Sequence, residues 1–364
     1  MKKVIGLMLS TAMVLATFTG CGSSNTQSTT TPTASKSTKN VTFIPKVTGN
    51  AFFESANKGA QKYATKWGFK VDYEGSATAS AASQVTVINQ AVQKGTDGIC
   101  ISAVDAAGVK EALKAAAAAG VTVTTWDSDV DPSVRKIMVS QGTPSQLGQM
   151  LVQMSYDSLK ERGKNPDKDA IKYCWHYSNA SVTDQNSWQA EGEKYIKQKY
   201  SNWKNVASSN YYSNQDAEQA ISVGESILSA HPDIDLIICN DSTSLPGQAQ
   251  AAQNKGLKAK NITITGFASP NSMKQYVNAG ILTRFGLWDC GVQGAMGCYM
   301  ANYLASGNKV KVGDKINIPD IGTVQVMPNS SINSSANDSD TSSGVMLLPK
   351  RVIFTKTNMN NYNF

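Results

Sequence analysis

Polar and aromatic side chains that could hold a small polyhydroxylated molecule stand directly after several strand-like apolar segments. They combine carboxylates, an amide, one ammonium group and aromatic rings: Lys46, Phe52, Phe53, Asp127, Asp129, Asp184, Gln185, Asp241 and Trp288. Carboxylates accept hydrogen bonds from vicinal hydroxyl groups, and a lysine donates to ring or hydroxyl oxygens. Aromatic faces cover the apolar side of a small polyol, so this combination predicts a mainly apolar pocket with a few placed polar groups.

Each of these residues also has a simpler interpretation. Asp184 could cap a helix instead of contacting a ligand, and Lys46 could be a solvated surface lysine. Asp127 and Asp129 form a D-x-D pattern that could bind a metal ion, although no nucleotide-binding signature accompanies it. Trp288 could belong to the core. The ligand-binding interpretation is favoured because all of these residues fall at the same predicted edge of the sheets.

A regular alternation of strand and helix patterns positions these side chains. Short apolar runs predict strands at 41–45, 69–73, 98–102, 121–125, 136–139, 171–175, 205–211, 235–239 and 262–267. Apolar residues at helical spacing predict helices at 50–67, 80–93, 106–119, 144–159, 184–198, 215–230, 245–254 and 270–279. Because the strand runs are uninterrupted rather than alternating, we expect parallel sheets that are covered on both faces.

The body that follows residue 40 has about 320 residues, which is long for a single domain core. Two successive arrays of alternating strands and helices indicate an α/β protein with two doubly wound, Rossmann-like lobes. In such sheets ligands bind beyond the carboxyl ends of the strands. The two lobes should therefore present their polar side chains to one shared site.

The first residues are typical of an export signal rather than of a fold. Lys2 and Lys3 precede an apolar stretch at 4–18, which is shorter than the ~20 residues that span a bilayer. We expect a signal peptide at 1–20, a lipidated Cys21 and a flexible tether to residue 40, rich in Ser and Thr. The alternative is an ordinary secretion signal with an incidental cysteine. This layout predicts a folded body on the outer face of the cell membrane, or in the periplasm where an outer membrane exists.

Composition excludes several other classes of protein. Hydrophobic residues make up 41% and charged residues 17% of the chain, as in ordinary globular proteins. The net charge of +7 includes four lysines before residue 40, and no Lys/Arg cluster predicts nucleic-acid binding. The cysteines after Cys21 have no zinc-like spacing and are expected to be buried free thiols. We therefore expect no metal and no cofactor.

Catalytic motifs are also lacking in the sequence. His176 and His231 are the only histidines, and G-x-S-x-G, Walker A, G-x-G-x-x-G and H-E-x-x-H are all absent. Paired carboxylates such as Asp127 and Asp184 could still serve a glycosidase. A binding protein is favoured over an enzyme.

Six separated motifs make the chain similar to a known family. They are FIPK at 43–46, TWDSD at 125–129, QGTPSQLG at 141–148, VTDQNSW at 182–188, FGLWD at 285–289 and LLPKRVIF at 347–354. With these motifs the chain resembles the autoinducer-2-binding proteins of Lsr import systems. These proteins are a branch of the type I periplasmic binding proteins, near the ribose and rhamnose binders. The resemblance runs from residue 41 to residue 364.

The resemblance implies two lobes joined by three crossover strands, expected near 141–145, near 285–288 and after Leu304. The first lobe would then comprise 41–143 plus about 287–308, and the second lobe 144–286 plus about 309–364. Such a protein closes on one small ligand by hinge motion. The family's closed form docks on the permease of an ABC transporter, and we expect a monomer.

The resemblance also implies roles for individual residues. Lys46 would donate to ligand oxygens and Asp127 would accept from hydroxyl groups. Asp184 and Gln185 would bind from the second lobe, and Pro246 would contribute chiefly backbone contacts. The implied ligand is the cyclic, boron-free tetrahydroxytetrahydrofuran form of autoinducer-2, taken up as a quorum-sensing signal.

One position departs from the family pattern. Gln248 stands where the family tends to have a small residue after the proline, so its amide could add a hydrogen bond or occupy ligand space. Phe52, Phe53 and Trp288 are expected as wall residues. Two alternatives stay open: another small sugar such as rhamnose or ribose as the ligand, and a membrane sensor instead of a permease as the partner.

Overall fold

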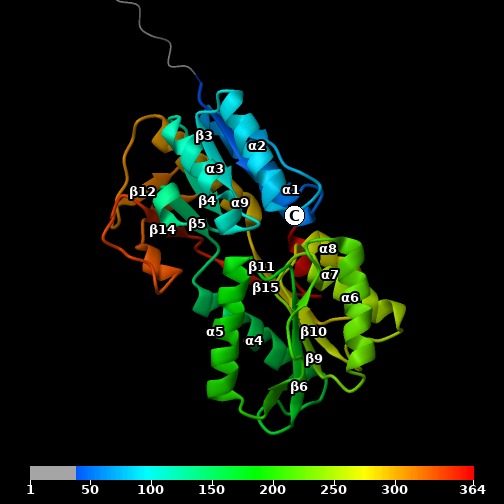
Figure 1. The fold of residues 1–364 in the computed structure, drawn as a ribbon. Coiled ribbons are helices and arrows are strands. Elements are labelled where there is room, and N and C mark those ends of the chain that lie inside the picture. The colour runs from blue at the N-terminus through cyan, green and yellow to red at the C-terminus, as the bar shows by residue number, and fades with distance from the viewer. Residues whose placement is uncertain (1–37) are drawn as a thin grey trace, which may run out of the picture. The chain divides into compact units, whose positions relative to one another are not determined.

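The computed structural model describes residues 38–364. The predicted signal peptide, Cys21 and the tether up to residue 37 lie outside the described residues. Two large sheets, each flanked by helices, and two two-stranded sheets make up the described chain (Figure 1). In residues 38–364, no helix combines the length and the apolar character that a bilayer crossing requires.

The first lobe is built on a six-stranded parallel sheet in the order β14-β5-β4-β3-β1-β2. Its strands are β1 (Asn40–Ile44), β2 (Lys70–Tyr73), β3 (Gly98–Ile101), β4 (Thr122–Trp126), β5 (Ile137–Ser140) and β14 (Gly344–Leu347). One face is covered by α1 (Ala51–Trp67) and α9 (Cys290–Ala305), the other by α2 (Ala81–Gln93) and α3 (Ala106–Ala118). Successive side chains of a strand point to opposite faces. Phe43 and Ile44 are nevertheless both buried, because helices cover both faces of the sheet. This double covering explains the uninterrupted apolar runs.

The second lobe has a parallel sheet in the order β10-β9-β6-β7, with β8 also paired to β6. Its strands are β6 (Ile171–Tyr177), β7 (Trp203–Asn205), β8 (Tyr211–Tyr212), β9 (Leu236–Cys239) and β10 (Thr263–Gly266). Its helices are α4 (Pro144–Glu161), α5 (Thr183–Lys199), α6 (Ala217–Ala230), α7 (Ser244–Asn254) and α8 (Pro270–Asn278). The predicted single strand at 205–211 is wrong. Both β7 and β8 pair with β6, and the Ser-Ser-Asn segment between them leaves the ladder.

Three segments cross between the lobes. The first joins β5 to α4, the second joins β11 (Arg284–Trp288) to α9, and the third joins β14 to β15 (Arg351–Thr355). Strands β11 and β15 pair antiparallel to each other. The side chain of Arg351 connects two crossings, because its Nη1 donates to the carbonyl oxygens of Gln141 at 2.8 Å and Leu348 at 3.2 Å. The predicted fold class, two doubly wound α/β lobes joined by three crossings, is confirmed.

One expected lobe boundary needs correction. Residues from about 309 to 364 were all expected in the second lobe, but β14 pairs with β5 and so extends the first sheet. The hairpin β12 (Lys315–Ile318) and β13 (Gly322–Gln325) precedes it in the chain. The third crossing therefore comes at Leu348, close to the chain end, because the chain first returns to the edge of the first sheet.

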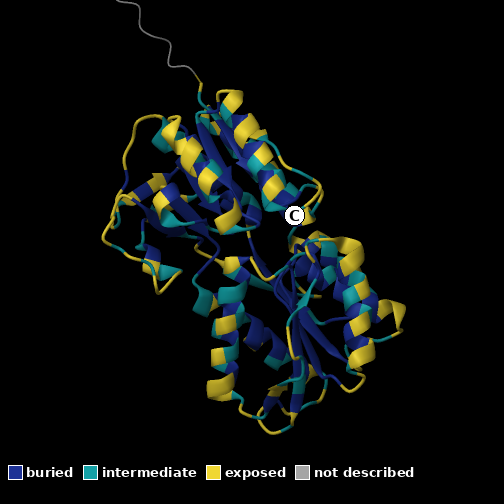
Figure 2. Cartoon of the chain, viewed as in Figure 1, coloured by how far each residue is buried: buried dark blue, intermediate teal, exposed yellow. Residues whose placement is uncertain are grey.

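Burial follows this layered arrangement, with buried strands between helices whose outer faces are exposed (Figure 2). The predicted free thiols are confirmed as buried: Cys100, Cys174, Cys239, Cys290 and Cys298. Helix α1 starts at Asn50, whose side chain accepts from the backbone N–H of Phe52 at 2.9 Å. A Cβ on Gly59 would meet Gly291 Cα at 2.3 Å, so α1 packs against α9 at a distance that only glycine allows. This close approach fixes the position of α1 against α9 on one face of the first sheet.

Candidate functional site

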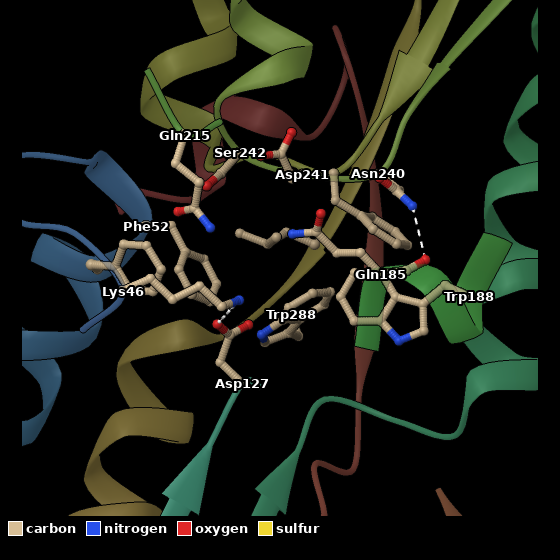
Figure 3. A pocket seen from close by; sticks show the side chains of 13 residues that line it. Lys46, Phe52, Asp127, Gln185, Trp188, Gln215, Asn240, Asp241, Ser242 and Trp288 are labelled. Carbon is tan, nitrogen blue, oxygen red and sulfur yellow. Dashed lines mark hydrogen bonds and ion pairs between the residues drawn. The ribbon is translucent and has the colours of Figure 1, made fainter. Parts of the chain in front are cut away.

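A pocket lies where the carboxyl ends of the strands of both lobes meet (Figure 3). The first lobe supplies a lysine, an aspartate and two phenylalanines, and the second lobe and the crossing strand β11 supply the remainder. The lining residues are Lys46, Phe52, Phe53, Asp127, Gln185, Trp188, Gln215, Asn240, Asp241, Ser242, Phe267, Leu287 and Trp288.

A buried ion pair forms the polar centre on the first-lobe side. Lys46 Nζ lies 2.8 Å from Asp127 Oδ2, and the two side chains are 2% and 6% exposed. Ser102 Oγ donates to the same oxygen at 2.7 Å. The backbone of Asp127 has a φ of 59°, a left-handed conformation that is costly for a residue with a side chain. The strand end is therefore strained in the conformation that turns this carboxylate toward the lysine.

Three carboxylates surround the single ammonium group of Lys46. Burial opposes the charge of Lys46, but Asp127, Asp184 and Asp241 outweigh it and raise its pKa. Burial also raises the pKa of Asp241, although Ser244 donates to it from its backbone N–H at 2.8 Å. The cluster thus holds more acceptors than one lysine can satisfy, which suits a ligand rich in hydroxyl groups.

Asp184 lies next to this cluster, in the first turn of α5. Burial raises the pKa of Asp184 to about 6; the attraction of Lys46 lowers it and the repulsion of Asp127 adds to it. Ser128 Oγ donates to its Oδ1 and Gln141 Nε2 to its Oδ2. Asp184 does not cap the helix, because α5 begins after Val182 and has no side-chain cap. Asp184 lines a larger groove of about 800 Å³ beside the pocket, together with Asp127.

Two amides line the second-lobe side. Ser178 Oγ donates to Gln185 Oε1 at 2.7 Å, which leaves Nε2 as the side-chain donor for another partner. Asn240 Nδ2 donates to the backbone oxygen of Gln185 at 3.1 Å (Figure 3). Asn240 Oδ1 is buried and has no hydrogen-bond partner among residues 38–364. A buried acceptor without a partner is costly, so this oxygen is a candidate contact for a ligand hydroxyl group.

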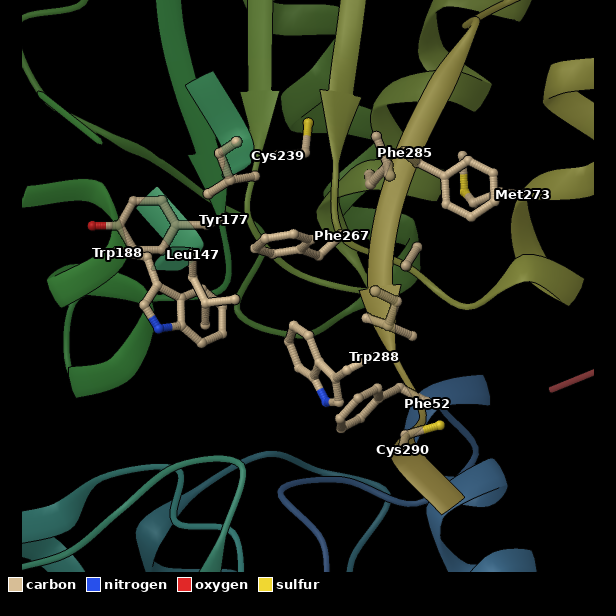
Figure 4. Packing of buried hydrophobic residues seen from close by; sticks show 14 of the residues in the cluster. Phe52, Leu147, Tyr177, Trp188, Cys239, Phe267, Met273, Phe285, Trp288 and Cys290 are labelled. Carbon is tan, nitrogen blue, oxygen red and sulfur yellow. The ribbon is translucent and has the colours of Figure 1, made fainter. Parts of the chain in front are cut away.

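Aromatic rings form the apolar wall of the pocket (Figure 4). The ring of Trp288 lies 5.9 Å from Phe52, 5.9 Å from Trp188 and 5.5 Å from Phe267 between centroids, each nearly perpendicular to it. Phe53 in turn packs edge-on against Phe52 at 5.1 Å. These edge-to-face pairs add to the free energy of burial and hold a rigid surface against which a ring could lie.

Seven of the eleven residues expected at the site line this pocket: Lys46, Phe52, Phe53, Asp127, Gln185, Asp241 and Trp288. Asp184 adjoins it. The remaining three, Asp129, Pro246 and Gln248, do not line it. Pro246 is half-buried in the first turn of α7.

Asp129 and Gln248 have other partners. Arg135 clamps Asp129 through Nε at 2.9 Å and Nη2 at 2.6 Å, so this carboxylate stabilises the first lobe. Gln248 is fully buried; its Oε1 lies 3.1 Å from His176 Nδ1, so the amide serves the interior of the second lobe. The D-x-D alternative also lacks support, because no group of three or more His, Cys, Asp or Glu suited to a metal occurs within residues 38–364.

The sequence prediction missed six of the lining residues: Trp188, Gln215, Asn240, Ser242, Phe267 and Leu287. Asn240 and Ser242 flank Asp241 directly after β9, so the position after a strand was a usable signal. Gln215 has a φ of 60° in the loop before α6, which no sequence pattern indicates. Trp188 and Phe267 looked like ordinary core residues.

Residues 41–309 match the family model described as periplasmic binding protein domain. The chain therefore belongs to the periplasmic binding protein family, a family of solute-binding transport proteins.

Among solved structures, the chain is similar to LsrB from Clostridium saccharobutylicum in complex with AI-2. The identity is 83% and the TM-score 0.89, covering 89% of this chain and 100% of that one. The ribose import binding protein RbsB of Bacillus subtilis is 24% identical over 275 residues, covering 73% of this chain and 81% of its own length. A solute-binding protein of an ABC transporter from Clostridium phytofermentas with bound L-rhamnose, 22% identical with a TM-score of 0.78 and coverage of 89% and 98%, shares the fold. The resemblance to LsrB-type proteins, predicted from the six motifs, is confirmed.

Proposed function

We propose that this chain captures AI-2, in the cyclic tetrahydroxytetrahydrofuran form, between its two lobes and delivers it to the permease of an ABC importer. The observation that carries the proposal is the 83% identity to LsrB in complex with AI-2, over the full length of that chain. Uptake of this quorum-sensing signal would be the biological role.

The chemistry of the pocket supports a compact polyol as the ligand. Lys46 donates to ring or hydroxyl oxygens, while Asp127 and Asp184 accept from hydroxyl groups. Among residues 38–364, Gln185 Nε2 donates to no other group and Asn240 Oδ1 accepts from none, so the pocket offers a ligand both a donor and an acceptor. The aromatic walls favour a ligand whose ring has an apolar face.

Binding without turnover is part of the proposal. Burial lowers the pKa of His176 to about 4, and the residue does not line the pocket. Asp127 Oδ2 is contacted by both Lys46 Nζ and Ser102 Oγ, which favours a role in holding hydroxyl groups over attack on a glycosidic bond. Incubation with candidate sugars should give a stoichiometric complex and no product.

The test of the proposal is ligand release and calorimetry. Purified protein from a host that makes AI-2 should release, on denaturation, a compound that induces bioluminescence in an AI-2 reporter strain. Isothermal titration calorimetry with AI-2, ribose and rhamnose then ranks the ligands. A silent reporter together with tight binding of ribose or rhamnose would show that the ligand is that sugar and not AI-2. These sugars are the second candidates because the chain is similar to RbsB and to the protein with bound L-rhamnose.

Lipid anchoring at Cys21 and a monomeric state complete the proposal. The motif with Gly20 and Cys21, followed by a Ser/Thr-rich segment, supports an anchored body on the outer face of the membrane. Fractionation of cells that express the wild type and Cys21→Ser tests it. The wild type should sediment with membranes, and the variant should appear in the soluble fraction; equal distribution would contradict the anchor.

A further inference from the structure

A chain of side-chain hydrogen bonds leads from the pocket wall to Asp184. Trp288 Nε1 donates to Gln293 Oε1 at 2.6 Å. Gln293 Nε2 donates to Gln141 Oε1 at 2.9 Å, and Gln141 Nε2 donates to Asp184 Oδ2 at 3.4 Å. Gln141 and Gln293 are 1% and 0% exposed, and neither lines the pocket.

The donor-to-acceptor direction of this series of hydrogen bonds is determined by the groups around Gln293. An indole N–H only donates and a backbone carbonyl only accepts. Gln293 faces both, because its Oε1 accepts from Trp288 and its Nε2 also donates to the carbonyl of Val139 at 3.0 Å. Its amide can therefore take one orientation only. Gln141 must then present Oε1 to Gln293, so its Nε2 points at Asp184 and requires an acceptor there.

The same series of hydrogen bonds joins the two lobes, because its residues lie at two of the crossings. Gln293 belongs to α9 of the first lobe, Gln141 follows β5 at the first crossing, and Trp288 ends β11 at the second. Arg351 holds the backbone oxygen of Gln141 at 2.8 Å. Together with Ser128 Oγ, two donors from the first-lobe side thus reach a carboxylate of the second lobe.

We propose that Gln141 and Gln293 are positioning residues that hold the Asp184 carboxylate as a hydrogen-bond acceptor in the closed arrangement of the lobes. The inference rests on the proposed binding function, in which Asp184 accepts from a ligand hydroxyl group. Neither glutamine touches the ligand; both act through Asp184.

Charged groups around Asp184 make the proposal testable by pH. Lys46 and Asp127 face Asp184 from the first lobe, and Asp241 faces Lys46 from the loop after β9. In Gln141→Glu, one oxygen would accept from Gln293 Nε2, and the other would face Asp184 Oδ2. Two acceptors at this distance need a proton between them, because like charges disfavour double ionisation. In this variant the pair should therefore keep a proton to higher pH than Asp184 alone does.

The experiment compares the wild type with Gln141→Glu and with Gln141→Met. The methionine side chain is similar in length to glutamine but has no hydrogen-bond donor. AI-2 affinity is measured by calorimetry between about pH 6 and about pH 8. We expect Gln141→Glu to bind within about threefold of the wild type at the acid end. It should weaken by about tenfold at the alkaline end, as the shared proton leaves. Gln141→Met should be three- to tenfold weaker by the same scale, about equally across this range.

A second measurement needs no ligand. The carboxyl carbon of Asp184, followed by ¹³C NMR in the ligand-free protein, should titrate at higher pH in Gln141→Glu than in the wild type. An unchanged titration, or the same pH dependence of binding in both variants, would overturn the positioning role. Failure of the wild type to bind AI-2 would instead refute the proposed function, while the NMR result would still decide this inference. If Gln141→Glu does not fold, Gln293→Met breaks the chain one link earlier, and unchanged AI-2 affinity in it would overturn the inference.

Discussion

The ammonium group of Lys46 lies 2.8 Å from Asp127 Oδ2 in a setting where both side chains are almost fully buried. Lys46→Met keeps the length of the side chain and removes its charge, leaving Asp127 beside Asp184 and Asp241. Because breaking one partner of a buried pair leaves an uncompensated charge, we expect a loss of about 3 kcal/mol in the free energy of unfolding. Urea denaturation followed by circular dichroism measures it.

The double variant Lys46→Met/Asp127→Asn is the matched control. It removes both charges, so it should regain at least about half of the lost stability. AI-2 affinity should stay reduced by tenfold or more, the scale of a lost hydrogen bond to a charged group. A double variant as unstable as Lys46→Met would show that the pair is not the source of the effect.

Asp184 should make stability depend on pH. Its pKa in the folded chain is about 6, above the ordinary value of ~3.9. Between these values the folded chain binds more protons than the unfolded chain, so the free energy of unfolding falls as pH rises. Asp184→Asn lacks this titration. Because Asp184 is partly exposed, we expect the variant to gain about 1–2 kcal/mol on the wild type between about pH 4 and about pH 7.

Urea denaturation of the two proteins at both pH values tests this prediction. Titrations common to both proteins cancel in the difference between their free energies of unfolding. A difference that stays constant, or that shrinks toward neutral pH, would mean that Asp184 is not held with a raised pKa.

Gln248 should matter for folding and not for the ligand. Its side chain lies against His176 Nδ1, and His176 Nε2 is already without a partner within residues 38–364. Gln248→Met would leave both ring nitrogens unpaired, at a cost of about 1–3 kcal/mol. We expect the AI-2 dissociation constant to change by less than about twofold, a free-energy change of well under 1 kcal/mol. Calorimetry and urea denaturation separate the two effects; a large loss of affinity with unchanged stability would return Gln248 to the site.

Asp129 should likewise affect stability. Asp129→Asn weakens the clamp on the buried guanidinium group of Arg135, which also donates to Ser343 Oγ at 2.9 Å and to the carbonyl of Gly344 at 3.0 Å. We expect a loss of about 3 kcal/mol in the free energy of unfolding with ligand affinity close to that of the wild type. The matched control is Asp131→Asn, in the half-exposed pair with Lys110, which should change stability little. Equal effects of the two variants would contradict the prediction.

Much of the fold was predictable because strands and helices leave periodic patterns. The strand at 171–175 and the helix at 50–67 appear within one or two residues of their predicted bounds. The edge strand β14 was not predicted, since its pairing with β5 is set by a contact about 200 residues distant in sequence. A hydrophobic pattern indicates that a strand exists, but it does not indicate which sheet the strand joins.

The candidate site was predictable to the same degree. Lys46, Asp127 and Gln185 follow strand ends, and the topology of parallel sheets brings such positions together. The directions of side chains are a different matter. Asp129 and Asp127 are two residues apart, yet one faces Arg135 and the other faces Lys46, because a left-handed backbone at Asp127 redirects the chain. No pattern in the sequence indicates that conformation.

The return of β14 to the first sheet has a consequence for how the chain acquires its fold. Gly344–Leu347 complete the sheet beside Ile137–Ser140, and α9 at 290–305 covers one of its faces. During synthesis the first lobe therefore lacks α9 until residue 305 has been made, and it lacks an edge strand until residue 347 has been made. Contacts so distant in sequence form slowly, since a long loop must close first. The first sheet can therefore be completed only after nearly the whole polypeptide has been synthesised.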